Sequence, residues 1–111
     1  MPYLEIAEWD KFQHYKHRNP PWIKLYSRLL DDDQFDCMQD DSKLLFFCLI
    51  LFASRKKNHV NLNYAWLQKK LPIEKKLTYK MFQPLVNAGY IICYNDDSTV
   101  IATCKQNALP E

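Results

Sequence analysis

The stretch NLNYAWLQKKLPIEKKLTYKMFQPLVNAGY (residues 61–90) contains two short helix patterns joined by a lysine-rich turn. Asn63 is a favourable N-cap for a helix over residues 64–71, which the following proline ends. Thr78 is placed to cap a second helix over residues 78–88. Two helices joined by a brief turn are the unit of a helix-turn-helix, and the rest of the chain is interpreted outward from them.

The second predicted helix has one apolar and one polar face. Phe82, Leu85 and Val86 share a face at helical spacing, so we expect them to pack into the core. Gly89 is the only glycine of the chain, and it stands one residue past this helix, where a left-handed C′ residue is favoured. The opposite, polar face consists of Tyr79, Lys80, Gln83 and Asn87.

Strand patterns lie on both sides of these helices. Residues 91–95 and 99–104 are rich in β-branched side chains, and the segment Asp96-Asp97-Ser98 between them is typical of a turn, which predicts a hairpin. Residues 58–62 alternate weakly and predict a very short strand. Another short strand is predicted near residues 3–7.

An apolar run of ten residues over 44–53 predicts a helix that continues to about Ser54. Asp40 or Asp41 is the expected N-cap. Because this helix is apolar nearly all round, we expect it to be central and to have no solvent-facing side. It is too short to cross a bilayer.

The segment before it is divided by two consecutive prolines, which cannot continue a helix. We therefore expect residues 11–18 and a helix over residues 22–30 to be separate elements, with residues 31–33 ending that helix and residues 35–38 forming a brief turn or helical piece. Four aromatic side chains are expected in the core, with base stacking as the alternative: Trp22, Tyr26, Trp66 and Phe82.

From residue 40 onward the predicted order is helix, short strand, helix, turn, helix and two-stranded hairpin. This order predicts an α+β, mainly helical fold: a winged helix-turn-helix domain over residues 40–104 with a small antiparallel hairpin wing. Residues 1–39 form an N-terminal extension that packs on the domain, and residues 105–111 a flexible tail.

Charge is unevenly distributed, although the net charge is only +2. Residues 31–41 contain six aspartates and no base, and residues 11–28 contain five Lys or Arg and no acid. Residues 54–80 contain eight Lys or Arg against one Glu, which leaves a local charge of +7. Blocks of opposite sign in a short chain indicate a folded molecule with a basic face.

A helix-turn-helix places its second helix in the major groove of DNA, where Gln and Asn pair with adenine and Lys reaches guanine or phosphate. The candidate base-facing residues are Tyr79, Lys80, Gln83 and Asn87. The candidate phosphate contacts are Arg55, Lys56, Lys69, Lys70, Lys75 and Lys76. A second basic surface is formed by Lys16, Arg18 and Lys24, where His14 and His17 are either solvated or phosphate contacts.

Three stretches of the chain resemble the phage-type replication initiation proteins: FQHYKHRNPPWIKLYSRLLDD (12–32), SKLLFFCLILFASRKKNHVNLNYAWLQKKL (42–71) and FQPLVNAGYI (82–91). The resemblance implies an N-terminal winged-helix domain that binds origin DNA ahead of a helicase-recruiting region. The matching residues of the family's opening motif are Arg18, Trp22 and Lys24, and Arg55 matches its Ala-Ser-Arg step. Because the sequence ends at Glu111, we expect the helicase-recruiting region to be absent.

Catalytic chemistry is not expected. One glycine cannot supply the glycine-rich loops that bind nucleotides, and no serine stands in a nucleophile elbow. Cys37 and Cys48 flank or enter the predicted buried helix and should be inert. We therefore expect no enzyme activity and no cofactor.

Metal binding is not expected either. The cysteines at 37, 48, 93 and 104 form no C-x-x-C pair, so reduced thiols are the main interpretation. A zinc site that combines them with His14 and His17 is the alternative, and their wide spacing argues against it. The acidic segment lacks the glycine of a calcium loop, and it is either solvated or a surface for a basic partner.

The predicted function is sequence-specific binding of double-stranded DNA at a phage or prophage replication origin. The alternatives are a winged-helix transcription regulator and a winged helix used only for protein contact. The expected partners are duplex DNA, a replicative helicase or helicase loader through regions absent here, and a second copy of the chain. Acids replace the basic start of a signal peptide, so we expect a cytoplasmic protein of a bacterial host cell and no membrane contact.

Overall fold

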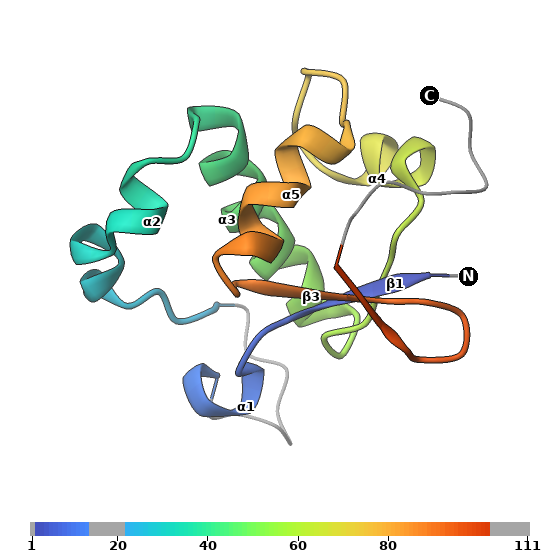
Figure 1. The fold of residues 1–111 in the computed structure, drawn as a ribbon, viewed down its shortest axis with the longest axis horizontal. Coiled ribbons are helices and arrows are strands. Elements are labelled where there is room, and N and C mark those ends of the chain that lie inside the picture. The colour runs from blue at the N-terminus through green and yellow to red at the C-terminus, as the bar shows by residue number, and fades with distance from the viewer. Residues whose placement is uncertain (1, 14–21, 103–111) are drawn as a thin grey trace.

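The fold is α+β. The computed structural model describes residues 2–13 and 22–102, which contain five α-helices, one 3-10 helix and a four-stranded antiparallel sheet (Figure 1). The elements are β1 (Tyr3–Ile6), α1 (Trp9–Phe12), the 3-10 helix η1 (Ser27–Asp31), α2 (Asp33–Asp36), α3 (Asp40–Arg55), β2 (Val60–Asn61), α4 (Tyr64–Lys70), α5 (Tyr79–Asn87), β3 (Ile91–Tyr94) and β4 (Val100–Ile101).

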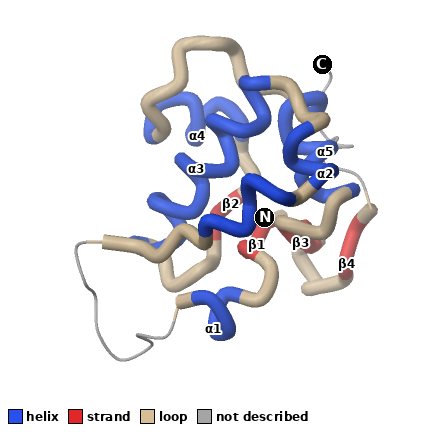
Figure 2. Tube along the Cα trace, turned by 90° about the vertical axis from the view of Figure 1, so that its left-hand side faces the viewer, coloured by secondary structure: helices blue, strands red, loops and turns tan. Residues whose placement is uncertain are grey.

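The first strand of the chain lies inside the sheet. The strand order is β2-β1-β3-β4, and Figure 2 shows the strands following one another across the molecule. Leu4 of β1 pairs with Val60 of β2 on one side and with Cys93 of β3 on the other. The predicted N-terminal extension, residues 1–39, contains β1. This strand joins β2 to the hairpin and contributes Leu4 to the core.

The core forms where α3 packs against α5 and the inner face of the sheet. Leu45, Leu49 and Ala53 of α3 are fully buried. The expectation that α3 has no solvent-facing side is wrong, because Leu44 is 47% exposed and Leu51 is 53% exposed. These two residues are seven positions apart and therefore share one face, which no described element covers.

The predicted N-cap of α3 is also wrong. Gln39 occupies the N-cap position and makes no side-chain capping bond, while Asp40 and Asp41 lie in the first turn of the helix. Carboxylates in a first turn still interact favourably with the helix dipole. The predicted end of the helix near Ser54 agrees with the observed end at Arg55.

The predicted helix over residues 22–30 is wrong, because only Ser27–Asp31 is helical, as η1. The side chain of Gln13 explains the difference. Its Nε2 donates to the Lys24 carbonyl at 2.9 Å, and its Oε1 accepts from the Lys24 N–H at 3.0 Å. The N–H and the C=O of Lys24 thus both bond to Gln13, which lies outside the predicted helix. Residues 22–26 are non-helical.

Two of the four expected core aromatics lie at the surface. Trp22 is 48% exposed and Tyr26 is 37% exposed, because the helix that would have turned them inward does not form. Phe82 is fully buried, as predicted, and Trp66 is half-buried against the core.

The end of α5 confirms the prediction for Gly89, which has φ +79°. The Gly89 N–H donates to the Val86 carbonyl at 3.0 Å, and the Tyr90 N–H donates to the Leu85 carbonyl at 2.9 Å. These two bonds form a complete Schellman motif. It turns the chain directly into β3, and the predicted hairpin follows as β3 and β4.

Candidate nucleic-acid interface

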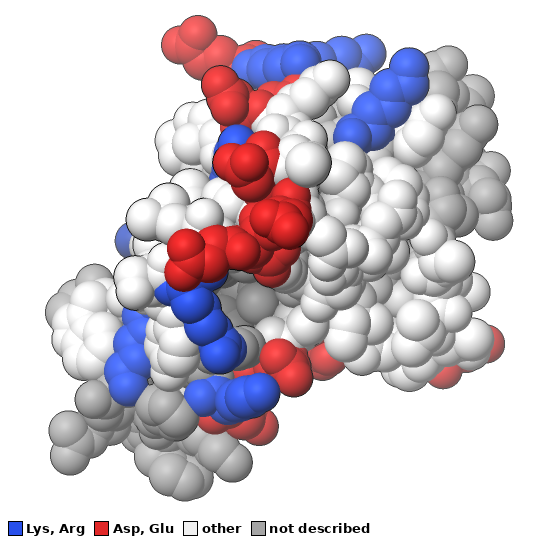
Figure 3. All heavy atoms as spheres, turned by 60° about the vertical axis from the view of Figure 1, so that its left-hand side comes forward, with Lys and Arg blue, Asp and Glu red and all other residues white. Residues whose placement is uncertain are grey.

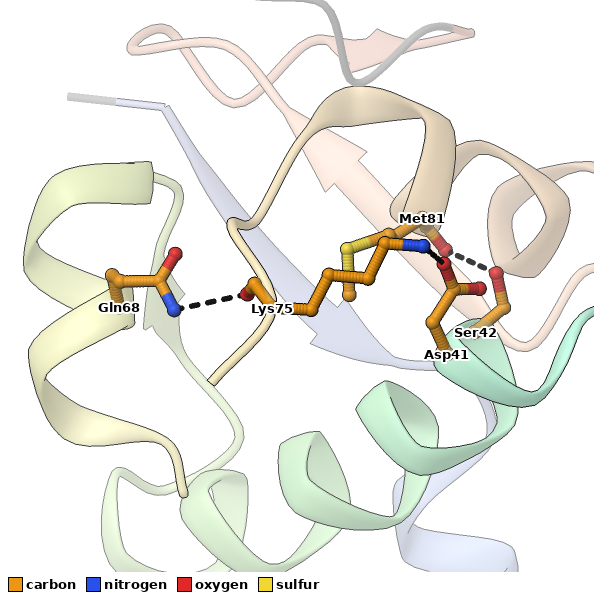
Figure 4. Close-up of polar contacts among 5 residues, drawn as sticks. All are labelled: Asp41, Ser42, Gln68, Lys75 and Met81. Carbon is orange, nitrogen blue, oxygen red and sulfur yellow. Dashed lines mark hydrogen bonds and ion pairs between the residues drawn. The ribbon is translucent and has the colours of Figure 1, made fainter. Parts of the chain in front are cut away.

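The turn between α4 and α5 (residues 71–78) is fastened by one side chain, that of Gln68 in α4. Its Nε2 donates to the Ile73 carbonyl at 2.9 Å and to the Lys75 carbonyl at 3.1 Å. Its Oε1 accepts from the Leu77 N–H at 2.7 Å. Figure 4 shows the bond to Lys75. The Gln68 amide therefore bonds to three residues of the turn and stabilises the orientation of α5 relative to α4.

Replacing Gln68 by alanine is expected to lower the free energy of unfolding by about 1 kcal/mol, because three partly exposed hydrogen bonds are lost. Backbone amides at residues 73–77 should exchange faster with solvent than in the unmodified protein. Gln68→Glu is the matched control: it keeps the acceptor for the Leu77 N–H and loses both donated bonds. Unchanged amide exchange in the alanine variant would contradict the assigned role of Gln68.

The N-terminus of α3 lies against this helix pair. The buried hydroxyl of Ser42 donates to the Met81 carbonyl at 2.9 Å, and the Lys75 ammonium pairs with the Asp41 carboxylate (Figure 4). The hydrogen bond to Lys75 holds the pKa of Asp41 below its usual value. Of the two adjacent candidate phosphate contacts, Lys75 is thus already paired, and Lys76 is exposed.

The candidate base-facing residues differ in accessibility. Lys80 and Asn87 are exposed on α5. Tyr79 is half-buried and packs against the core. Gln83 is half-buried, and its Nε2 donates at 2.9 Å to both the Asn87 Oδ1 and the Ala102 carbonyl beyond β4. Both hydrogens of the Gln83 NH2 group are therefore used, so it could donate to a base only if its bond to Asn87 or to Ala102 were released.

The remaining candidate phosphate contacts lie at the C-terminal ends of α3 and α4, where cations favour the helix dipole. Lys69 and Lys70 are exposed in the last turn of α4, and Arg55 is exposed in the last turn of α3. The Lys56 ammonium lies 5.9 Å from the ring centre of Trp66, so the end of α3 contacts α4. Lys56 therefore lies next to α4, although it follows α3 in the chain.

The second basic surface is described only in part. Lys24 is half-buried, and Lys16, Arg18, His14 and His17 lie outside the described residues, as does Cys104. Among the described residues, no group of three His, Cys, Asp or Glu side chains is arranged to hold a metal ion. No described helix is long and apolar enough to cross a membrane.

The prediction that burial makes both Cys37 and Cys48 inert is half wrong. Cys48 is buried, and burial raises the pKa of its thiol. Cys37 is exposed, and it occupies the C-cap position of the short helix α2, outside α3.

Acidic side chains gather on another face of the molecule, the one that carries α2 (Figure 3). Asp31, Asp33, Asp36 and Asp40 are exposed there. Beside them, a cavity of about 510 Å³ reaches the ring of Tyr90. The Tyr90 hydroxyl is buried and has no hydrogen bond of ordinary geometry to a described residue. Its pKa is raised by burial and by the nearby Asp32 carboxylate.

Comparisons with known proteins found no match: no protein-family model, no curated protein and no solved structure matches this chain. The resemblance to phage replication initiators therefore stays a prediction from the sequence.

Proposed function

We propose that this protein binds double-stranded DNA sequence-specifically, with α4, the turn and α5 acting as the helix-turn-helix of a winged-helix domain. One observation carries the proposal: exposed lysines lie at the end of α4, in the turn and on α5 of the helix pair whose turn Gln68 fastens. Cations placed around a helix suited to the major groove supply the phosphate contacts that orient such a helix on a duplex.

In this arrangement α5 enters the major groove. Lys80 and Asn87 face base edges first, and Gln83 joins them when it releases Ala102. The phosphate contacts are Arg55, Lys56, Lys69, Lys70 and Lys76, with Lys75 held back by Asp41. The hairpin tip carries Asp96 and Asp97, which repel phosphate, so the hairpin supports α5 and does not contact the duplex backbone.

Two substitutions are expected to affect duplex binding differently. Lys76→Ala should weaken binding to every sequence and lower the salt slope by about one unit, as the loss of one phosphate contact does. Lys75→Ala is the matched control and should change the slope less, because Lys75 is paired with Asp41. Gln83→Ala should reduce discrimination at one base pair by about 1 kcal/mol, the low end of the usual range, because its amide already bonds to Ala102.

Titration of labelled duplexes by fluorescence anisotropy at three or more salt concentrations measures both effects. Equal slopes for the Lys76→Ala and Lys75→Ala variants would contradict the assignment of Lys76. No duplex binding at low salt would overturn the proposed function as a whole.

We further propose that the duplex is a replication origin of a phage or prophage, which rests on the sequence resemblance. Selection of bound genomic fragments tests this. Recovery of a repeated element beside replication genes supports origin recognition, and recovery of single promoter operators supports a transcription regulator instead.

Protein contact is the second candidate function, and a specific surface favours it. Trp22 and Leu25 are about half exposed and Leu30 is 84% exposed, directly before the exposed aspartates of η1 and α2. Apolar groups beside acids suit a partner with an apolar and basic face, such as a helicase or its loader. Crosslinking through the exposed Cys37 would detect such a partner and would leave duplex binding intact.

A further inference from the structure

Three aromatic rings stack in a row on the outer face of the sheet. The rings of His59 and Tyr3 have their centres 4.1 Å apart with an interplanar angle of 20°. Tyr3 and Tyr94 follow at 4.9 Å and 15°. Leu4 and Ile6 alternate with Tyr3 along β1 and are buried, so the stack lies on the side of the sheet that faces away from the core.

The two tyrosines are fixed at their hydroxyls. The Tyr3 hydroxyl donates to Ser98 Oγ at 2.9 Å, and the Tyr94 hydroxyl donates to Glu5 Oε1 at 3.1 Å. Tyr3 and Tyr94 are direct partners in the register of β1 and β3, so cross-strand packing accounts for their contact. His59 adds a third ring before β2 begins, and it is exposed.

The loop that carries His59 is held in an unusual conformation. Lys57 and Asn58 both have positive φ, 54° and 55°. The Asn58 side chain accepts from the Ile6 N–H at 2.7 Å and donates to the Ile6 carbonyl at 3.0 Å, which pairs the loop with the end of β1. Left-handed residues that surrounding bonds hold in place are enriched at binding sites. Here they fix the His59 ring over Tyr3.

Charge differs between the two ends of the stack. His59 follows the exposed cations Arg55, Lys56 and Lys57. The other end meets Glu5 and the hairpin tip, which carries Asp96 and Asp97. A polyanion is therefore favoured at the His59 end and disfavoured at the Tyr94 end.

We propose that the outer face of His59 stacks on a base of single-stranded nucleic acid, with Lys57 on the adjoining phosphate. A base has a flat π face whatever its identity, so a stack of preoriented rings beside a cation binds single strands with little sequence preference. This site lies on the sheet and loop 57–59, and it uses none of the base-facing residues of α5. It goes beyond the proposed duplex binding and does not depend on it.

The test is the binding of a fluorescein-labelled twelve-nucleotide oligo(dT) by anisotropy at two salt concentrations. His59→Ala should weaken binding by about 5- to 150-fold, the usual effect of losing one base stack, and leave the salt slope unchanged. His59→Phe keeps a flat ring and should restore most of the affinity. Lys57→Ala should lower the salt slope by about 0.7. Chemical shifts of the His59 ring should move upfield on titration.

The outcomes separate this inference from the proposed function. Oligo(dT) binding that is unchanged in His59→Ala overturns the inference, as does the absence of oligo(dT) binding by a protein that binds duplex. Binding of oligo(dT) that depends on His59 supports the inference, even if duplex binding fails. Lys43→Ala serves as the charge-matched control, because Lys43 of α3 lies against the Phe35 ring and belongs to neither proposed surface, so oligo(dT) binding should stay as it is.

Discussion

Leu49→Ala is expected to lower the free energy of unfolding by about 2–5 kcal/mol, the range for truncating a buried leucine. Leu49 lies in the middle of α3 and is fully buried among α5 and the sheet. The substitution removes apolar contacts and leaves a cavity that the packed neighbours can fill only in part. Urea denaturation followed by circular dichroism measures the change.

Leu51→Ala provides the matched control on the same helix. Leu51 is 53% exposed, so its truncation should change the free energy of unfolding by less than about 0.5 kcal/mol. A larger effect for Leu51→Ala than for Leu49→Ala would contradict the placement of α3, since a helix turned by half a revolution would exchange their burial.

Gly89→Val is expected to destabilise the protein by about 2 kcal/mol, the cost of a left-handed conformation for a residue with a Cβ. Gly89 has φ +79°, a conformation that is costly for residues with a Cβ and most costly for β-branched ones. A Cβ built at Gly89 meets no atom within 4 Å, so the cost comes from the backbone and not from a steric clash with neighbours. Thermal and urea unfolding midpoints should both fall.

Gly89→Asn is the matched control, because it also removes the glycine but causes less backbone strain than valine. Asparagine tolerates the left-handed region better than valine does, so the asparagine variant should be the more stable of the two. If valine and asparagine had the same effect, or neither had any, the Schellman end of α5 would not be the structure that the chain adopts in solution.

The Gly89 variants also test the proposed DNA surface, because Gly89 ends α5, the helix proposed to enter the major groove. Gln83 of α5 bonds to Ala102, so the hairpin holds part of the polar face of α5. A variant that loosens the turn into β3, such as Gly89→Val, should therefore alter discrimination by Gln83 more than it alters the salt slope, which depends on lysines elsewhere.

Several features of this fold are determined by short stretches of sequence. The Asn63 side chain accepts from the Trp66 N–H three residues later, and the glycine end of α5 is closed by bonds that span five residues or fewer. Turn residues between two β-branched runs likewise predict the hairpin. Each of these interactions joins residues that are close in the chain. A short stretch of sequence therefore contains both partners and is enough to predict the interaction.

Tertiary structure alone decided the features that join distant residues. The bonds from Gln13 to Lys24 prevent the predicted helix over residues 22–30, and β1 enters the sheet between strands that are encoded more than 50 residues later. The pairing of Lys75 with Asp41 also comes from the packing of α3 against α5.

The same holds for the candidate sites. Composition and spacing placed a basic stretch beside a helix pair, because charge and helical period are local properties. They could not identify which lysine is neutralised or that His59 stacks on Tyr3, since these contacts exist only after the chain has brought β1, the loop 57–59 and β3 together. Long-range contacts are set by how whole faces pack, and no single segment of the sequence carries that information.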